Sequence, residues 1–455
     1  MRRQGNQVYH TVTGSADTTR LRLRVPVLLP CDPTCSVLRD AVVDVGSDGR
    51  IVYAGAAATA PEFRGSTRQL TGILLPGFVN SHAHSAMTML RGAGSDLPLM
   101  RWLSEEMWPA EAHLDANDIY DGTLLGAVEM LRNGVTTSNE MYFHPEAVAR
   151  AVVAAGSRAV VAGVIIDLPG KPWAGMLSAA NSWIDSAGLR HGPGERIEIA
   201  YGPHSAYALP YPALEVVAEE ARSRGALVHI HVAESVGEDD EQRKMYGSVP
   251  QLLAAAGVLD GRVLAAHGVH LSTQDINLLA KHRVGVAHCP GSNAKLASGV
   301  APLLVLMRSG VPVGLGTDGP ASNDDLDVLE EARLAATFAR IGAMDAAALG
   351  AAEVLLLATR GGAAALGRSD IGAVEAGRWA DLVHVDIDDP AFATGTDGPD
   401  EQLLANLVWA AGARQVTDVW VAGEQVVAGG ESTRVDRAQA QSAVGAIARQ
   451  LRAVR

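Results

Sequence analysis

The sequence is poor in cysteine and aromatic residues, and it has no cluster of basic residues and no long apolar run. Only three cysteines occur among 455 residues, namely Cys31, Cys35 and Cys289. So few cysteines, in an odd number, indicate a reducing compartment, for which we predict the cytoplasm. The spacing of Cys31 and Cys35 matches neither a redox Cys-x-x-Cys pair nor a four-cysteine zinc site.

Charge and hydropathy exclude two classes of partner. The chain carries 37 basic and 51 acidic residues, and its net charge is -14. Because phosphate contacts need clustered Lys and Arg, we expect no nucleic-acid partner. No window approaches the length of uncharged apolar sequence that a membrane span requires, so we expect no membrane partner either. The remaining expectation is a globular protein that acts on a small molecule.

Several catalytic motifs are also missing. The sequence lacks the His-x-Glu and Pro-Cys-x-x-Cys pattern of cytidine-deaminase-type enzymes, and it has no His-Glu-x-x-His helix. Gly361 and Gly362 lie in an Ala-rich, helix-like region without the lysine of a phosphate-binding loop. The chemistry must therefore come from other residues.

The middle of the chain alternates regularly between apolar strand candidates and segments with helical periodicity. The strand candidates are 78–82, 134–141, 159–166, 197–202, 227–231, 263–267, 284–288 and 311–316. Helical patterns lie between them, for example at 119–132, 145–155, 212–224, 272–281 and 302–309. Eight such strands alternating with helices predict an α/β protein with a (β/α)8 TIM-like barrel.

Both ends of the chain are rich in short strands with turn residues between them. They predict a small β-sandwich domain that is built from the two chain ends. We therefore divide the chain into a flexible tail, a first sandwich part, the barrel, a second sandwich part and an amphipathic C-terminal helix. The respective ranges are 1–20, 21–75, 76–372, 373–435 and 436–455.

Three barrel strands end in side chains that can bind metals. His82 and His84 are one residue apart at the end of the first strand, so both point to the same side. His231 ends the fifth strand, and Asp318 follows the eighth. Because all strand ends meet at one mouth of the barrel, these groups predict a catalytic metal site. His229 faces the same way as His231; spacing does not choose between them, and we favour His231 because it lies nearer the strand end.

Other polar residues surround these candidate ligands. Glu234 follows the fifth strand, where it is better placed to move a proton than to bind the metal. His267 ends the sixth strand and is the best candidate to orient or deprotonate a water molecule. We expect His288, Ser292 and Asn293, at and after the end of the seventh strand, to support the ligands. The fourth strand ends without a lysine that could bridge two metals, which favours a single ion.

Together these segments resemble the amidohydrolase superfamily, in particular the methylthioadenosine/S-adenosylhomocysteine deaminases and the triazine chlorohydrolases. The resemblance covers about 21 to 423 and depends on the segments 76–84, 87–92, 141–144, 202–205, 231–234, 266–267, 292–296 and 316–323. It implies one divalent ion, Zn²⁺ or alternatively Fe²⁺. The implied ligands are His82, His84, His231 and Asp318.

The resemblance also implies a reaction, the hydrolytic deamination of an adenine nucleoside to its inosine analogue and ammonia. The substrate would be of the methylthioadenosine, 5′-deoxyadenosine or adenosine type. Hydroxide formed at the metal would add to the carbon that bears the amine. Glu234 would protonate the adjacent ring nitrogen, His267 would steady the water or the oxyanion, and Asp318 would pass a proton to ammonia.

The substrate contacts implied by the resemblance are Glu111, Trp102 and His204, with Glu111 at the ribose hydroxyls. Relatives that accept S-adenosylhomocysteine place arginines after the third strand to bind its carboxylate. Here Ala162 falls where one of them is expected, and the following loop, 167–178, offers only Lys171. We therefore predict a preference for a neutral 5′-substituent.

Two other functions remain open. The same site could remove chloride, an alkylamine or an acyl group from an N-heterocyclic or amide-containing metabolite. Alternatively, the barrel could be metal-free and serve as a scaffold or binding module, although such a protein has no reason to keep the ligands and both proton carriers. Members of this superfamily often form dimers or tetramers, so we expect a homo-oligomer by analogy.

Overall fold

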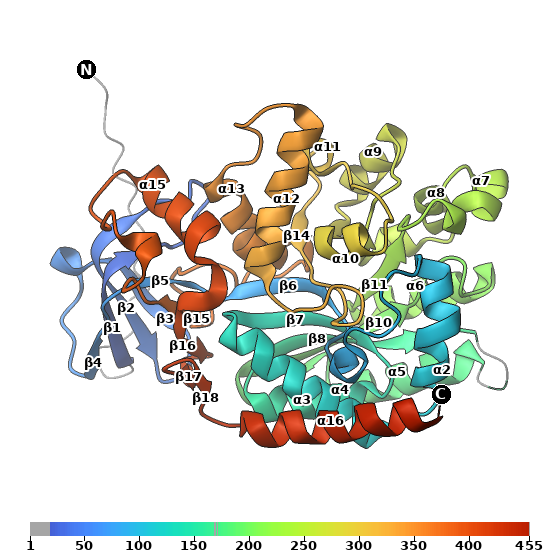
Figure 1. Cartoon of the computed structure of the whole chain (residues 1–455), viewed down its shortest axis with the longest axis horizontal. Helices are drawn as coiled ribbons and strands as arrows, with labels where there is room; N and C mark the ends of the chain where they lie inside the picture. The colour runs from blue at the N-terminus through green and yellow to red at the C-terminus, as the bar shows by residue number, and fades with distance from the viewer. Residues whose placement is uncertain (1–18, 168–169, 171, 455) are drawn as a thin grey trace.

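The strands of the middle region form a barrel in the computed structural model, which describes residues 19–167, 170 and 172–454 (Figure 1). The barrel strands are β6 (Phe78–Ala83), β7 (Val135–Tyr142), β8 (Arg158–Ile165), β10 (Ile197–Pro203), β11 (Leu227–Val232), β12 (Arg262–His267), β13 (Gly285–His288) and β14 (Val313–Leu315). Each is hydrogen-bonded to the next in this order. The ring closes where Asp318 N donates to His82 O at 3.0 Å. The predicted (β/α)8 barrel is confirmed.

The barrel strands are buried on both faces, which explains their nearly continuous apolar sequence. In β8, Val160 and Ala162 belong to the cluster inside the barrel, whereas Val161 and Ile165 join the cluster that the helices cover. This alternation follows the period of two along a strand. It decides which side chains can reach the barrel mouth.

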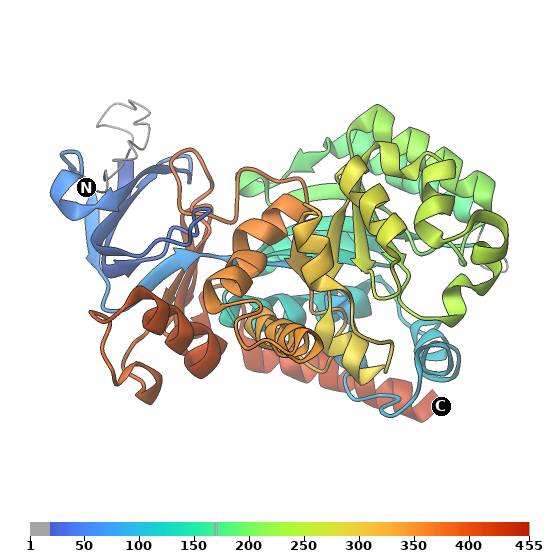
Figure 2. The same ribbon diagram turned by 90° about the horizontal axis from the view of Figure 1, so that it is seen from above.

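Helices surround the barrel, as Figure 2 shows from above. The longer ones are α3 (Ala116–Arg132), α4 (Pro145–Ala155), α5 (Trp173–Ala187), α6 (Tyr211–Arg224), α9 (Thr273–His282) and α12 (Val328–Ala343), and the shorter ones include α7 (Asp240–Tyr246), α8 (Val249–Ala255), α10 (Pro290–Lys295), α11 (Leu303–Arg308), α13 (Ala351–Leu356) and α14 (Gly362–Ala365). Capping boxes begin α3 at Asp115 and α9 at Ser272. The C-terminal helix α16 (Arg437–Val454) lies along α3.

A second sheet combines strands from both ends of the chain. Its strands are β1 (Thr19–Leu28), β2 (Leu38–Gly46), β3 (Ile51–Ala56), β4 (Ser66–Gln69), β5 (Ile73–Pro76), β15 (Leu382–Val385), β16 (Val416–Val421), β17 (Glu424–Ala428) and β18 (Glu431–Ser432). The two ends meet where β15 pairs with β5. Val43 of β2 and Trp420 of β16 lie in one buried cluster, so the sheet curls around its own core. The prediction of a small β domain from both ends is confirmed.

The predicted tail, 1–20, lies outside the described residues except for Thr19 and Arg20, which begin β1. Near the other end, α15 (Asp400–Ala405) and the π-helix η9 (Asn406–Ala411) pack beside the small sheet. Within the described residues, no helix combines the length and apolar character that a membrane crossing needs.

One segment between β6 and α3 contributes to the functional site. It contains the 3₁₀-helix η2 (Ser85–Leu90), α1 (Leu99–Arg101), the π-helix η3 (Trp102–Met107) and α2 (Trp108–Glu111). Leu99, Trp102 and Met107 of this segment are buried. π-helical turns are uncommon and often occur at functional sites, and here the segment lies beside the barrel mouth.

Candidate metal centre and substrate cavity

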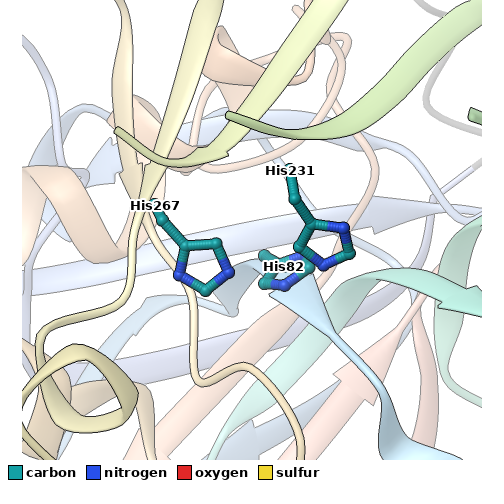
Figure 3. Close-up of side chains that lie close together, drawn as sticks. All are labelled: His82, His231 and His267. Atoms are coloured by element: carbon teal, nitrogen blue, oxygen red, sulfur yellow. The ribbon is translucent and has the colours of Figure 1, made fainter. Parts of the chain in front are cut away.

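Four of the predicted site residues converge at the mouth of the barrel. His82 Nε2 and His84 Nε2 each lie 3.2 Å from Asp318 Oδ1. His231 Nε2 lies 3.4 Å from His84 Nε2. Figure 3 shows the rings of His82, His231 and His267 gathered at one place, and one ligand atom from each lies within 4.8 Å of the other two. The structure thus brings together strands that are far apart in the sequence.

Hydrogen bonds at Nδ1 hold the rings of His84 and His231 so that their Nε2 atoms are free to bind a metal. His84 Nδ1 lies 2.5 Å from the carbonyl oxygen of Met141, and His231 Nδ1 lies 2.7 Å from that of His204. A carbonyl can only accept, so in the neutral rings the proton is on Nδ1 and the Nε2 lone pair faces the centre. His82 Nε2 is buried and makes no well-formed hydrogen bond with any described residue.

This donor set fits a zinc ion. Three imidazole nitrogens and one carboxylate oxygen are typical zinc ligands, and a catalytic site also leaves a position open to water. The other oxygen of the Asp318 carboxylate, Oδ2, accepts hydrogen bonds from Ser292 at 2.6 Å and Ser322 at 2.8 Å, so Oδ1 is turned toward His82. Burial alone would raise the pKa of Asp318, but the neighbouring histidines hold it well below its usual value. The carboxylate is therefore ionised.

Glu234 and His267 lie beside this centre. Glu234 Oε2 is 3.7 Å from His267 Nε2, and both side chains are buried. Burial, reinforced by the charge of Asp318, raises the pKa of Glu234 to about 8. Without a metal ion, Glu234 is therefore mainly protonated at neutral pH and can donate a proton.

His267 is held in a defined orientation. Its Nδ1 lies 3.0 Å from Asn293 Oδ1, which can only accept, so Nε2 is the acceptor in the neutral ring. Burial lowers the pKa of His267, which favours the neutral ring. His267 and Asp318 both have a positive φ, at 72° and 59°, a backbone conformation that is uncommon for residues other than glycine. His288 is buried nearby, and burial together with His267 lowers its pKa to about 4.

A cavity of about 580 Å³ opens above these groups. Its lining includes all three residues predicted to contact the substrate, Glu111, Trp102 and His204. Glu111 Oε1 accepts a hydrogen bond of 2.7 Å from the Tyr142 hydroxyl, and burial raises the pKa of Glu111. Burial also lowers the pKa of His204 to about 4. The remaining lining is largely apolar.

The structure shows which residues of β8 and the segment after it reach the cavity. Ala162 does not line the cavity but lies within the barrel interior, whereas Val164 and Ile166, further along the chain, reach the cavity. Val164 and Ile166 are uncharged, and Lys171 lies outside the described residues.

Two residues near the centre, Ser322 and Tyr142, had no predicted role, and His229 was considered only as an alternative ligand to His231. Ser322 donates a hydrogen bond to Asp318, and Tyr142 donates one to Glu111. His229 Nε2 lies 2.8 Å from His82 Nδ1. Ser322 and Tyr142 occur in segments that carry the family resemblance, but nothing in the sequence indicates their partners. For His229 the signal was present, because the period of two already pointed it inward.

Comparisons with known proteins agree with this geometry. A model of the amidohydrolase family matches residues 73–426. The chain is 42% identical over 400 residues to a 5-methylthioadenosine/S-adenosylhomocysteine deaminase of Pelotomaculum thermopropionicum, covering 86% of this chain and 89% of that protein.

Two solved structures are also similar. An adenosine deaminase from Xanthomonas campestris with bound zinc has a TM-score of 0.89 and 37% identity, covering 95% of this chain and 99% of that one. An atrazine chlorohydrolase from Arthrobacter aurescens has a TM-score of 0.85, covering 94% of this chain and 100% of that one, but at 24% identity it shows the fold alone. The resemblance inferred from the sequence is confirmed. Because the family model spans the barrel together with its converging ligand groups, the chain belongs to the amidohydrolase family.

Proposed function

We propose that this chain is a zinc-dependent hydrolase that deaminates adenine nucleosides to their inosine analogues and ammonia. The observation that carries the proposal is the convergence of three histidines and Asp318 beside the buried Glu234, all but His82 in the lining of one cavity. The relatives named as deaminases and the zinc-containing adenosine deaminase support the same activity.

We assign the metal to His82, His84, His231 and Asp318. When bound there, zinc supplies a Lewis acid that lowers the pKa of a coordinated water from about 15.7 toward about 7. The hydrogen bonds to Met141 and His204 keep two of the imidazoles in the tautomer that such binding requires.

The reaction also needs proton transfers, which we assign to residues beside the metal. Glu234 would donate its proton to the ring nitrogen next to the amine, which makes the adjoining carbon more electrophilic. His267, with Nε2 as acceptor, would hold the attacking water and then the developing oxyanion. Asp318, which is ionised, would accept the proton released by the attacking water on Oδ1 and pass it to the departing amine. The hydroxyl of the addition intermediate would then return a proton to Glu234 as the carbonyl of the product forms.

The cavity lining favours an uncharged 5′-substituent. Among the described residues that line it, none is lysine or arginine, whereas Val164, Ile166 and Met176 are apolar. A free carboxylate entering this region would lose hydration without gaining a cationic partner. We therefore propose methylthioadenosine, 5′-deoxyadenosine or adenosine as the substrate.

Ammonia release from these three nucleosides and from S-adenosylhomocysteine tests the substrate assignment. We expect kcat/KM for S-adenosylhomocysteine to be at least about tenfold lower, the equivalent of one lost charge-assisted contact. Formation of the inosine analogue, followed by its absorbance, is the parallel measurement. Dominant turnover of S-adenosylhomocysteine would contradict the assignment.

Replacing Glu111 with Gln tests whether the ribose is recognised. If the carboxylate accepts from ribose hydroxyls, KM for nucleosides should rise about tenfold, because a charged acceptor is replaced by a neutral one. Tyr142 can still donate to the amide oxygen, so the local structure should persist. Simple N-heterocycles that lack ribose should be turned over unchanged; an equal loss for them would instead support the removal of another group from a smaller substrate.

We also propose, by analogy with the superfamily, that the protein is a homo-oligomer. Its three cysteines are free and buried, which supports a reducing compartment such as the cytoplasm.

A further inference from the structure

His229 lies directly behind His82, outside the proposed set of metal ligands. It is fully buried on β11, two residues before His231 and on the same face of the strand. Its Nε2 is 2.8 Å from His82 Nδ1, and the two rings are nearly perpendicular at 89°. His82 therefore differs from His84 and His231, whose Nδ1 atoms face backbone carbonyls.

A carbonyl fixes the tautomer of its partner, but a second imidazole does not. Each neutral imidazole has one N–H donor and one acceptor nitrogen, so this pair has two proton arrangements. In one, His82 Nδ1–H donates to His229 and the His82 Nε2 lone pair is free. In the other, His229 donates, and the His82 proton is on Nε2, the atom that lies 3.2 Å from Asp318 Oδ1 and would bind the metal. Only the first arrangement permits metal binding.

We propose that His229 is a positioning residue that makes His82 a metal ligand by accepting its Nδ1 proton. This inference rests on the proposed metal centre, but not on the identity of the substrate. In the metal-binding arrangement the His229 proton is on Nδ1, which has no hydrogen-bond partner among the described residues. Metal binding therefore selects the arrangement that leaves this buried N–H of His229 unsatisfied.

Without an acceptor at position 229, His82 would have two unfavourable choices. It could keep the proton on Nδ1, where the N–H would be buried without a partner. It could instead move the proton to Nε2, where it would compete with the metal. Either choice weakens metal binding.

Two substitutions of similar size separate this role from simple packing. Gln can place its side-chain oxygen near the position of His229 Nε2, whereas Met fills a similar volume without a comparable acceptor. We expect His229→Met to weaken zinc binding by about 10–100-fold, the usual effect of removing a partner behind a ligand. His229→Gln should restore most of the affinity. The measurement is competition for zinc with a chromophoric chelator, with no substrate present.

His384→Met provides the matched control. His384 is buried in the small sheet and its Nε2 accepts from Gly72 N at 3.1 Å, so this variant loses a comparable hydrogen bond far from the metal. It should keep wild-type zinc affinity even where its thermal stability falls. If His229→Met does not fold, His229→Asn, whose amide is too short to reach His82, tests the same point.

Wild-type zinc affinity in His229→Met, or equal losses in the Met and Gln variants, would overturn the role of His229. A wild-type protein that binds no zinc would overturn the metal centre itself, and the inference with it. These outcomes differ in whether the unmodified chain retains the ion.

Discussion

Replacing Glu234 with Gln should reduce deamination by about 10²–10⁴-fold while the protein still binds zinc. The amide has nearly the same shape as the protonated carboxyl but cannot transfer a proton to the ring nitrogen. Burial raises the pKa of Glu234 to about 8, so in the metal-free chain the wild-type group is already neutral and the substitution adds no new charge imbalance. The expected loss is therefore chemical rather than structural.

The measurement is kcat on the preferred nucleoside, together with zinc content and thermal stability of the same variant. Glu238→Gln is a matched comparison, because Glu238 Oε2 accepts from Glu234 N at 2.9 Å and the Gln oxygen can still accept. It should lose far less activity. Near-normal turnover by Glu234→Gln would remove Glu234 from the mechanism.

Replacing Asp318 with Asn should abolish activity, with a loss on the order of 10³-fold or more, and should also weaken zinc binding. Asp318 brings the only carboxylate of the proposed ligand set and contacts both His82 and His84. Ser292 and Ser322 both donate to Oδ2, so they would hold the amide oxygen and turn the NH₂ group toward the histidines. An amide donor at that point opposes a cation.

Zinc titration and turnover on the same preparation check this prediction. Asp324→Asn is the control, since Asp324 lies in the same loop but pairs with Lys295 at 2.7 Å, away from the centre, and its side chain is 56% exposed. It should retain zinc and activity. Full activity of Asp318→Asn would show that the ligand set is wrong.

The positions of the candidate ligands could be predicted because they follow from local periodicity. His82 and His84 end a short apolar run, and strand ends in a parallel barrel meet at one mouth. Burial and the period of two thus fix which side chains face inward, whatever the surrounding helices do. The barrel itself could be predicted for the same reason.

What the sequence could not reveal depends on contacts between distant segments. The carbonyl partners of His84 and His231 come from strand β7 and from His204, the residue that follows β10, and their positions depend on the register between neighbouring strands. The pairing of His229 with His82 joins residues 147 positions apart. The two-residue repeat of a β-strand could show only that His82 and His229 both face inward.

Oxygen-18 labelling tests the central claim most directly. Zinc-loaded protein and chelator-treated protein would each be incubated with methylthioadenosine in H₂¹⁸O, and the product would be analysed by mass spectrometry alongside ammonia. We predict that the loaded protein releases one ammonia for each inosine analogue formed, that the analogue carries ¹⁸O at the carbon that held the amine, and that the treated protein is inactive. No ammonia from the zinc-loaded protein, or equal activity after metal removal, would contradict a metal-dependent hydrolytic deaminase.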